Sequence, residues 1–505
     1  MNATSSSPSV NPWLPPLVIF LLLGHLLLMM IRPEYPLGDP GTPWHFKWGQ
    51  VLVEDKVLYR YDFFSHTLDG KEWVNYQWLF QVFVGITQAI GAIPFTTAVL
   101  MLIYGCIPVL LCQRIMKEGC HAGLALGFSA LGWFVLTMHS LARPHIFTYL
   151  FFGILLERLY RIYEGKATLR SSWWLVPMMM VWTNFHGGFS VGLFLIGVVF
   201  WVALPRWFLN KTPEHWAVVK ELFWVGFACG MVSLINPYGW NLHFHILKFL
   251  ELKCLANWEE FASPDFYSPS GNIRGYELMI LGVLSVFFWC GKSKRLNELD
   301  FVLILVFLHF SLQSTRHVNL FVLVAAPVLA RGFDELLRKK EDWYIVKRGH
   351  EMSRDQLLLK GGRIFFPLIV IGYLWLSFKG EPFFEEDFYD QNLSLESAEF
   401  IEEHRDRIKR PFNTDNVGGA LIYYFGPDLK VFFDDRADFY WQEFVTDVYF
   451  PVRFAKEEWS KILEEYQVDT LILPKKNPLN PLLNVTPVWQ VVHEDDLNII
   501  YFKTD

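Results

Sequence analysis

The chain has 505 residues, of which 52% are hydrophobic and 17% aromatic but only 19% charged. A soluble domain carries about 25% charged residues, so this composition excludes an ordinary soluble enzyme and indicates a membrane protein. The net charge of −7 does not indicate a basic surface for nucleic acid. Residues 379–505 hold 26 Asp and Glu but 13 Lys and Arg, so an acidic tail follows a basic membrane body.

Apolar runs long enough to cross a bilayer, which takes roughly 17 to 25 residues, recur along the first three quarters of the chain. The amphipathic segment 73–92 is instead predicted to lie in or re-enter the membrane interface. We therefore expect a polytopic α-helical membrane protein of about 11 to 13 transmembrane helices. The predicted spans are 13–31, 95–113, 122–140, 146–163, 173–185, 188–209, 221–236, 276–290, 299–313, 318–332 and 364–378.

Basic residues gather in the connections 158–170, 291–298 and 331–363, and the positive-inside rule places these in the cytoplasm. Connections on the opposite face are then extracytoplasmic. They are the first external loop 32–72, Arg143–His145, Asn184–Gly188, Trp258–Glu260, Arg316-His317 and the whole tail 379–505. The sequence thus predicts that these polar motifs share one face of the membrane.

The tail alternates helical and strand patterns, which favours one packed sheet with helices. Helices are predicted at 395–407 and 457–466, and strands at 430–433, 470–473, 489–492 and 498–502; the segment 418–426 reads as a glycine turn with an apolar stretch. We expect a transmembrane domain over 1–378 and a small C-terminal α/β soluble domain over 379–505.

Asp39 follows the first apolar segment, beside Trp44 and His45. A carboxylate shielded by indole rings can have a tuned pKa and act as a general base, or it can bind a divalent cation (Mg or Mn) that holds a phosphate. Asp62, in the same loop, would be the second metal ligand. The alternative for both aspartates is a turn-capping role.

Arg143, His145, Arg316 and His317 stand at the ends of spans on the external face. Cations in this place suit an anionic phosphate, and the alternative is an anchor for lipid headgroups. Asn184 and His186 interrupt an apolar region, where polar groups persist if they line a cavity or form an interhelical hydrogen bond.

Trp258, Glu259 and Glu260 open a further external loop. An acidic pair beside an indole ring suits a sugar, because aromatic faces stack on pyranose rings; a solvated charged loop is the alternative. The run Asp434–Asp438 follows a predicted strand, where carboxylates often face ligands. A structural Asp–Arg network is the alternative there.

The order of these motifs resembles the GT-C-type membrane glycosyltransferases, and more closely their uncharacterised bacterial relatives with a C-terminal α/β domain. The resemblance rests on short motifs spread over most of the chain, none of them diagnostic alone. They are Asp39 with Trp44–Gly49, Tyr61–Thr67, Asn75–Leu79, Arg143-Pro144, Trp182–Gly188, Asn236–Gly239 and Gly418-Gly419 with Phe433–Arg436. Gln77 departs from the pattern, since the relatives have Glu at that place.

The resemblance implies a GT-C-like enzyme that moves a hexose or pentose from a polyprenyl-phosphate donor to a glycan, lipid or protein acceptor outside the cytoplasm. It implies a bacterial inner membrane as the location and inverting displacement at the anomeric carbon. Asp39 would be the catalytic base or a metal ligand, oriented by His45 and Asp62. Phosphate would be bound by Arg143, His145, Arg316 and His317.

Two other functions use the same residues. A transporter or flippase of lipid-linked or anionic substrates would need the Arg, His and Asn cavity without any bond formation. A catalytically silent assembly protein would keep the fold alone, and Gln77 in place of Glu fits that alternative. The sequence shows no repeated halves, which transporters often have, and its long first external loop favours the enzyme.

Overall fold

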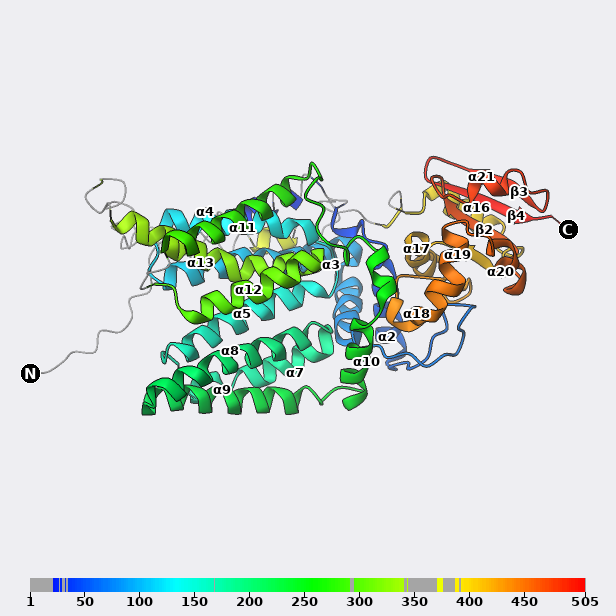
Figure 1. Ribbon diagram of the computed structural model, residues 1–505. Helices are drawn as coiled ribbons and strands as arrows, with labels where there is room; N and C mark the ends of the chain where they lie inside the picture. The colour runs from blue at the N-terminus through cyan, green and yellow to red at the C-terminus, as the bar shows by residue number, and fades with distance from the viewer. Residues whose placement is uncertain are drawn as a thin grey trace, which may run out of the picture.

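A computed structural model describes residues 21–26, 28, 29, 32, 35–167, 169–290, 295–339, 343, 370–375, 387–389 and 392–504. A helical bundle and a smaller domain with the C-terminus lie end to end (Figure 1). The described parts of predicted spans 13–31 and 364–378 are helical. The rest of those spans, with residues 291–294 and most of 340–363, lies outside the described residues.

The bundle consists of helices that run roughly side by side and match the predicted spans (Figure 1). They are the second arm of α3 (Trp78–Lys117), α4 (Ala122–Leu136), α5 (His145–Tyr163), α7 (Leu175–Phe185), α8 (Phe189–Asn210), α9 (Pro213–Val232), α11 (Gly271–Cys290), α12 (Glu298–Gln313) and α13 (Val318–Arg338). The short elements η2 (Thr137–His139) and α6 (Leu169–Ser172) lie in the connections.

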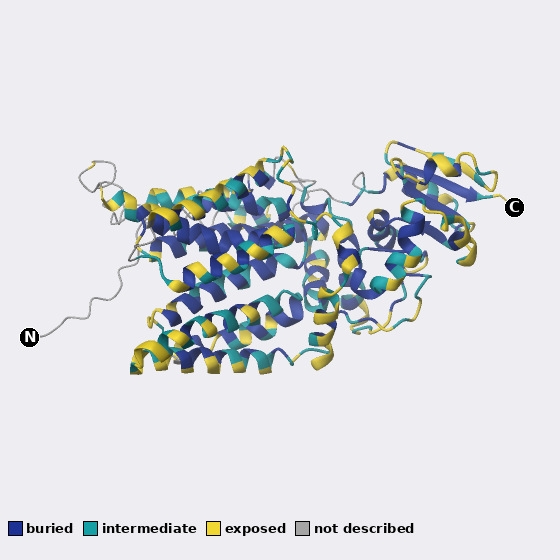
Figure 2. Ribbon diagram, in the orientation of Figure 1, coloured by how far each residue is buried: buried dark blue, intermediate teal, exposed yellow. Residues whose placement is uncertain are grey.

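Among the described residues, three helices are long and apolar enough to cross a membrane: Trp78–Lys117, Ala122–His139 and Phe189–Asn210. Others are shorter than a span, such as α7 with 11 residues and α12 with 16. Large apolar side chains are nevertheless exposed, with Trp201 at 68% and Phe288 at 82%. Exposed positions, in yellow, recur along the outer helices of the bundle (Figure 2). The fold therefore supports a membrane body, and the count of 11 to 13 spans stays a prediction.

Three elements lie across the end of the bundle that faces the C-terminal domain: α2 (Thr42–Asp55), the first arm of α3 and α10 (Trp240–Leu250) (Figure 1). The first arm of α3 is the helix expected within 73–92. It ends where Gly91 and Ala92 leave helical geometry, just before Pro94, whose ring removes a backbone donor. The turns η1 (Tyr35–Leu37), η3 (Lys253–Asn257) and η4 (Thr315–His317) lie in neighbouring connections.

The C-terminal domain contains a four-stranded sheet in the order β1-β2-β4-β3. Strand β1 (Pro411–Asn413) is parallel to β2 (Thr470–Pro474), whereas β4 (Asn498–Lys503) is antiparallel to both β2 and β3 (Trp489–Glu494). The helices are α16 (Leu395–Glu403), α17 (Asp415–Phe425), α18 (Ala437–Phe444), the π-helical η5 (Val445–Tyr449), α19 (Phe450–Arg453), α20 (Trp459–Glu465) and α21 (Asn480–Leu483). The expected α/β character is confirmed.

Two local predictions in this domain are wrong. Residues 430–433 are not a strand of the sheet; among the described residues, Val431 forms an isolated bridge with Ser65 of the first external loop. Gly418 and Gly419 do not form a turn but lie inside α17. A side chain on either glycine would collide with backbone, since a Cβ would lie 2.3 Å from the oxygen of Phe433 or 2.0 Å from that of Pro40.

The first external loop belongs to the core of the C-terminal domain. Trp44, Trp48, Phe64 and Trp73 are at most 4% exposed and pack in one cluster with side chains such as Phe433. A second, larger cluster holds the bundle together. Burial of the indole rings therefore holds the loop against the C-terminal domain. The polar residues between these aromatic positions consequently lie where the helical bundle meets the C-terminal domain.

Candidate active site

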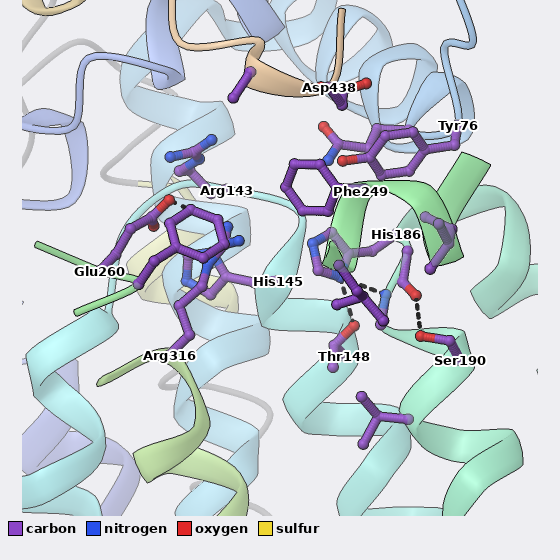
Figure 3. Close-up of a pocket in the computed structure, with 18 of the residues that line it drawn as sticks. Tyr76, Arg143, His145, Thr148, His186, Ser190, Phe249, Glu260, Arg316 and Asp438 are labelled. Atoms are coloured by element: carbon purple, nitrogen blue, oxygen red, sulfur yellow. Dashed lines mark hydrogen bonds and ion pairs between the residues drawn. The ribbon is translucent and has the colours of Figure 1, made fainter. Parts of the chain in front are cut away.

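A cavity lies where the bundle faces the C-terminal domain (Figure 3). Its empty space, including the open mouth, is about 1120 Å³. Figure 3 shows Arg143, His145, Glu260 and Arg316 together, with Tyr76, Phe249 and His186 across from them. Predicted site residues that line this cavity are Trp44, Arg143, His145, His186, Glu260, Arg316 and His317.

Arg143 lies at the centre of the charged side of this cavity. Its Nη1 donates to Oδ1 of Asp39 and its Nη2 donates to Oδ2 of Asp435, each at 3.0 Å. Oδ2 of Asp39 accepts from the Gly41 amide at 2.8 Å, and the Trp44 indole donates to Oδ1 of Asp435. Asp39 comes from the first external loop and Asp435 from the C-terminal domain, so one guanidinium joins the two.

Burial raises the pKa of Asp435 to about 7, against the opposing effect of Arg143, and the negative charge of Asp39 adds to the effect of burial. Burial alone would lower the pKa of Arg143, but Asp39 and Asp435 raise it above its usual range. Arg143 is therefore a permanent cation. Asp435, in contrast, is suited to exchange a proton near neutral pH.

Gly41 allows this close approach. A Cβ on Gly41 would lie 1.9 Å from Oδ2 of Asp435 and 2.8 Å from Nη2 of Arg143. Gly419 supports the same turn from the other side, because its Cβ would collide with the Pro40 oxygen. Glycines in both chain segments thus let the loop and the tail touch at the charged centre.

Arg316 is held more loosely than Arg143. Its guanidinium lies 3.4 Å from Oε1 of Glu260 and 4.1 Å from the ring centroid of Phe261, and its side chain is 28% exposed against 12% for Arg143. Burial alone would raise the pKa of Glu260, but Arg316 and Arg143 hold it below its usual range. Arg316 is therefore the arginine with donors to spare for an anion.

His186 presents a neutral ring. Its Nδ1 accepts from the Gly188 amide at 3.1 Å, and it lies 2.8 Å from the Thr148 hydroxyl (Figure 3). Because an amide can only donate, the ring proton is on Nε2. Burial, together with the charges of Arg316 and Arg143, lowers the pKa of His186 to about 3. The ring is thus a hydrogen-bond donor that does not change its charge near neutral pH.

The wall formed by residues 73–77 is aromatic and amide-rich, with Trp73, Asn75, Tyr76 and Gln77. Oδ1 of Asn75 is buried and has no hydrogen-bond partner among the described residues. A buried polar atom without a partner costs free energy that a ligand hydroxyl can offset. Gln77, where a glutamate was expected, also lines this wall.

His45 and Asp62 do not line the cavity. The His45 ring is fully buried behind Trp44, with ring centroids 3.8 Å apart. Asp62 accepts from the amide and hydroxyl of Ser65 at 2.8 and 2.6 Å, and pairs with Nη1 of Arg436 at 2.8 Å. Both residues support the aromatic wall and the loop. Asp39 itself stands behind Arg143 and is likewise not a lining residue.

Three further predicted residues lie beside the cavity. Asn184 uses its whole amide within the bundle: it donates to the carbonyls of Met180 and Ile235 and accepts from the Trp78 indole, all within 2.9 Å. The Trp258 indole donates to Asp415 of the C-terminal domain at 2.8 Å, and Glu259 is exposed. Their proposed contacts with substrate stay predictions.

The residues do not fit the expected divalent cation. Asp39 pairs with Arg143 and Asp62 pairs with Arg436, so the two expected metal ligands each have a different arginine as partner. Within the described ranges, no group of three or more His, Cys, Asp and Glu side chains could hold a metal ion. We therefore derive no step through a metal.

Sequence reasoning missed Asp435 and Tyr76 as site residues. In the sequence, Asp435 is one member of the acidic run 434–438, for which a structural network is the alternative. That alternative holds for Asp434, which binds Arg436 through both oxygens at 2.8 and 2.7 Å. The adjacent carboxylate of Asp435 turns to Arg143 instead. The position directly after the buried run 431–433 is the sequence signal for a site residue, but it applies equally to Asp434 and Asp435.

The sequence matches no family model and no curated protein. The fold is similar to the crystal structure of the Archaeoglobus fulgidus oligosaccharyltransferase in the apo form, with a TM-score of 0.57, 10% identity, and coverage of 92% of this chain and 69% of that one. Two further structures cover the same shares at 10% identity: AglB from A. fulgidus with an inhibitory peptide and a dolichol-phosphate (TM-score 0.56), and the enzyme tethered to an acceptor peptide containing the NVT sequon (0.55). The resemblance to a GT-C-type fold with a C-terminal soluble domain is confirmed at the level of fold.

Proposed function

We propose that the chain is a membrane glycosyltransferase that moves a sugar from a polyprenyl-phosphate donor to an extracytoplasmic lipid, glycan or protein acceptor. The observation that carries this proposal is the cavity whose lining contains both Arg316, a loosely held cation, and Asp435, a carboxylate suited to act as a base. The shared fold supports it, because one similar structure contains a dolichol-phosphate and another an acceptor peptide.

The donor phosphate would bind Arg316, with the His186 Nε2 proton as a second donor. The phosphate gains charge as it leaves, so fixed donors aimed at it stabilise the transition state more than the ground state. Arg143 contributes less to this binding, since two carboxylates already surround it. The sugar would lie against Trp44 and Tyr76, with Asn75 accepting from a sugar hydroxyl.

The reaction would be an inverting displacement. The acceptor oxygen forms a bond to the anomeric carbon while the bond from that carbon to the phosphate oxygen breaks. The electron pair of the broken bond leaves with the polyprenyl phosphate, and the acceptor proton passes to Asp435. We assign the base to Asp435 in preference to Asp39, because Asp435 lines the cavity and Asp39 stands behind Arg143. Asp39 is then a positioning residue.

The polyprenyl tail would enter beside α10. One side of this helix, through Ile246 and Phe249, lines the cavity. The other side leaves Trp240, Phe244 and Leu247 at least 60% exposed. A helix with an exposed apolar stripe suits the boundary between headgroups and acyl chains. We propose a bacterial inner membrane as the location, with the C-terminal domain outside the cytoplasm.

The test is to incubate the purified protein with radiolabelled polyprenyl-phosphate sugars and extracted acceptors. Wild type should label an acceptor, and Asp435→Asn should lose at least 100-fold in rate, in line with the loss of a general base. Asp428→Asn, which alters an exposed carboxylate of the same domain, is the matched control. Absence of any labelled acceptor, together with movement of intact lipid-linked sugar across liposomes, would establish the transporter instead.

A further inference from the structure

The Arg143 guanidinium lies between two carboxylates, those of Asp39 and Asp435. It contacts one oxygen of each of two carboxylates at 3.0 Å, and all three side chains are between 12% and 15% exposed. Two carboxylates this close repel each other unless a cation lies between them. In this chain the cation is part of the polypeptide.

The remaining carboxylate oxygens are also in use. The Gly41 amide donates to Asp39, and the Trp44 indole donates to Asp435. Magnesium requires near-octahedral coordination by six oxygen atoms, and calcium takes six to eight. The nearby third acid, Glu260, is paired with Arg316. A metal ion would have to displace Arg143 and compete with both of these donors.

We propose that Arg143 takes the place of a divalent cation in this centre, so that sugar transfer needs no added metal. Only the statement that sugar transfer needs no added metal rests on the proposed function. The guanidinium neutralises Asp39 and Asp435, holds the first external loop to the C-terminal domain, and leaves phosphate binding to Arg316.

A specific gain of function follows. Replacing Arg143 with glutamine removes the internal cation but leaves Asp39 and Asp435 facing each other. The repulsion between them should then be relieved by an ion from solution. Arg143→Gln should therefore bind Mn²⁺, a divalent ion that oxygen ligands accept and that electron paramagnetic resonance detects.

The experiment measures Mn²⁺ binding to the purified full-length protein after chelator treatment, by electron paramagnetic resonance and by thermal unfolding. Wild type should show no bound ion at this centre and no change in Tm. Arg143→Gln should bind one ion, at least tenfold more tightly than any other site that wild type presents to Mn²⁺, and should regain part of its lost Tm. Arg316→Gln is the matched control, because Arg316 pairs with one carboxylate and its loss should create no ion site.

The inference is overturned if wild type binds one Mn²⁺ that is lost in Asp39→Asn, or if folded Arg143→Gln binds none. If Arg143→Gln does not fold, Mn²⁺ titrations of wild type and of Asp39→Asn still test whether the native centre binds an ion. These readouts do not depend on sugar transfer, so failure of the proposed function leaves them unchanged. Where transfer is observed, it should keep its full rate in the presence of chelator.

Discussion

Arg143 and Asp435 lie 292 positions apart in the chain and form an ion pair of 3.0 Å at the edge of the cavity. One residue precedes a bundle helix and the other follows the buried run 431–433 of the C-terminal domain. Residues of both the helical bundle and the C-terminal domain are therefore needed to form the site. A domain expressed without its counterpart would present only half of the charged centre.

The transfer rate should depend on pH through Asp435. A base acts when deprotonated, and burial raises the pKa of Asp435 to about 7, so the rate should rise with pH through that value and fall by about tenfold per pH unit below it. A pH–rate profile of wild type measures this. His186→Asn should keep the same midpoint, because the pKa of His186 is already lowered to about 3. A midpoint that moves in this variant would contradict the assignment.

Arg316 should control donor affinity. Arg316→Gln is expected to raise KM for the polyprenyl-phosphate donor by about 10- to 100-fold, as expected for the loss of a charge-assisted hydrogen bond of about 1.5–3 kcal/mol. Steady-state kinetics with varied donor measures this. Arg274→Gln, which removes an exposed arginine paired with Glu277, should leave KM unchanged. An equal effect of both variants would point to a general charge effect.

Gly41 should tolerate no side chain. Gly41→Ala forces a Cβ to within 1.9 Å of Asp435, so the loop and the tail must separate, at a cost of about 1–3 kcal/mol typical of overpacking. Thermal unfolding and transfer rate should both fall. Gly197→Ala, in the middle of α8 with nothing within 4 Å of its Cβ, should lose neither. Wild-type transfer by Gly41→Ala would refute the need for close approach.

Arg436 should be essential for stability. It is 2% exposed and pairs with both Asp62 and Asp434, so Arg436→Ala leaves two buried carboxylates without their cation, at a cost of about 3–5 kcal/mol. Unfolding of the purified protein should shift to clearly lower temperature. Lys456→Gln, at an exposed position of the same domain, should not shift it. If Arg436→Ala matched wild type, the network would not join the loop to the tail.

Local patterns in the sequence predicted most of the helices and the sheet. Apolar runs identified the bundle helices from 95–113 onward, and short apolar segments identified β2, β3 and β4, whereas β1 was not predicted. These signals are local because a helix or strand is specified by the spacing of its own apolar residues. Motifs at the ends of spans, such as Arg143, His186 and Arg316, were also expected on one face, and they line one cavity.

Only the tertiary structure determined which partner each of these residues contacts. Asp434 and Asp435 are adjacent and chemically alike, yet one is buried against Arg436 and the other faces Arg143. Gly418 and Gly419 resemble a turn, but they lie inside α17, where the missing side chains make room for the backbones of Phe433 and Pro40. Two of these partners lie far away in the chain, since Arg143 is 292 positions from Asp435 and Pro40 belongs to the first external loop. The sequence by itself therefore determined the elements and the types of charge at their ends, and the packing of the first external loop against the tail determined which charges meet.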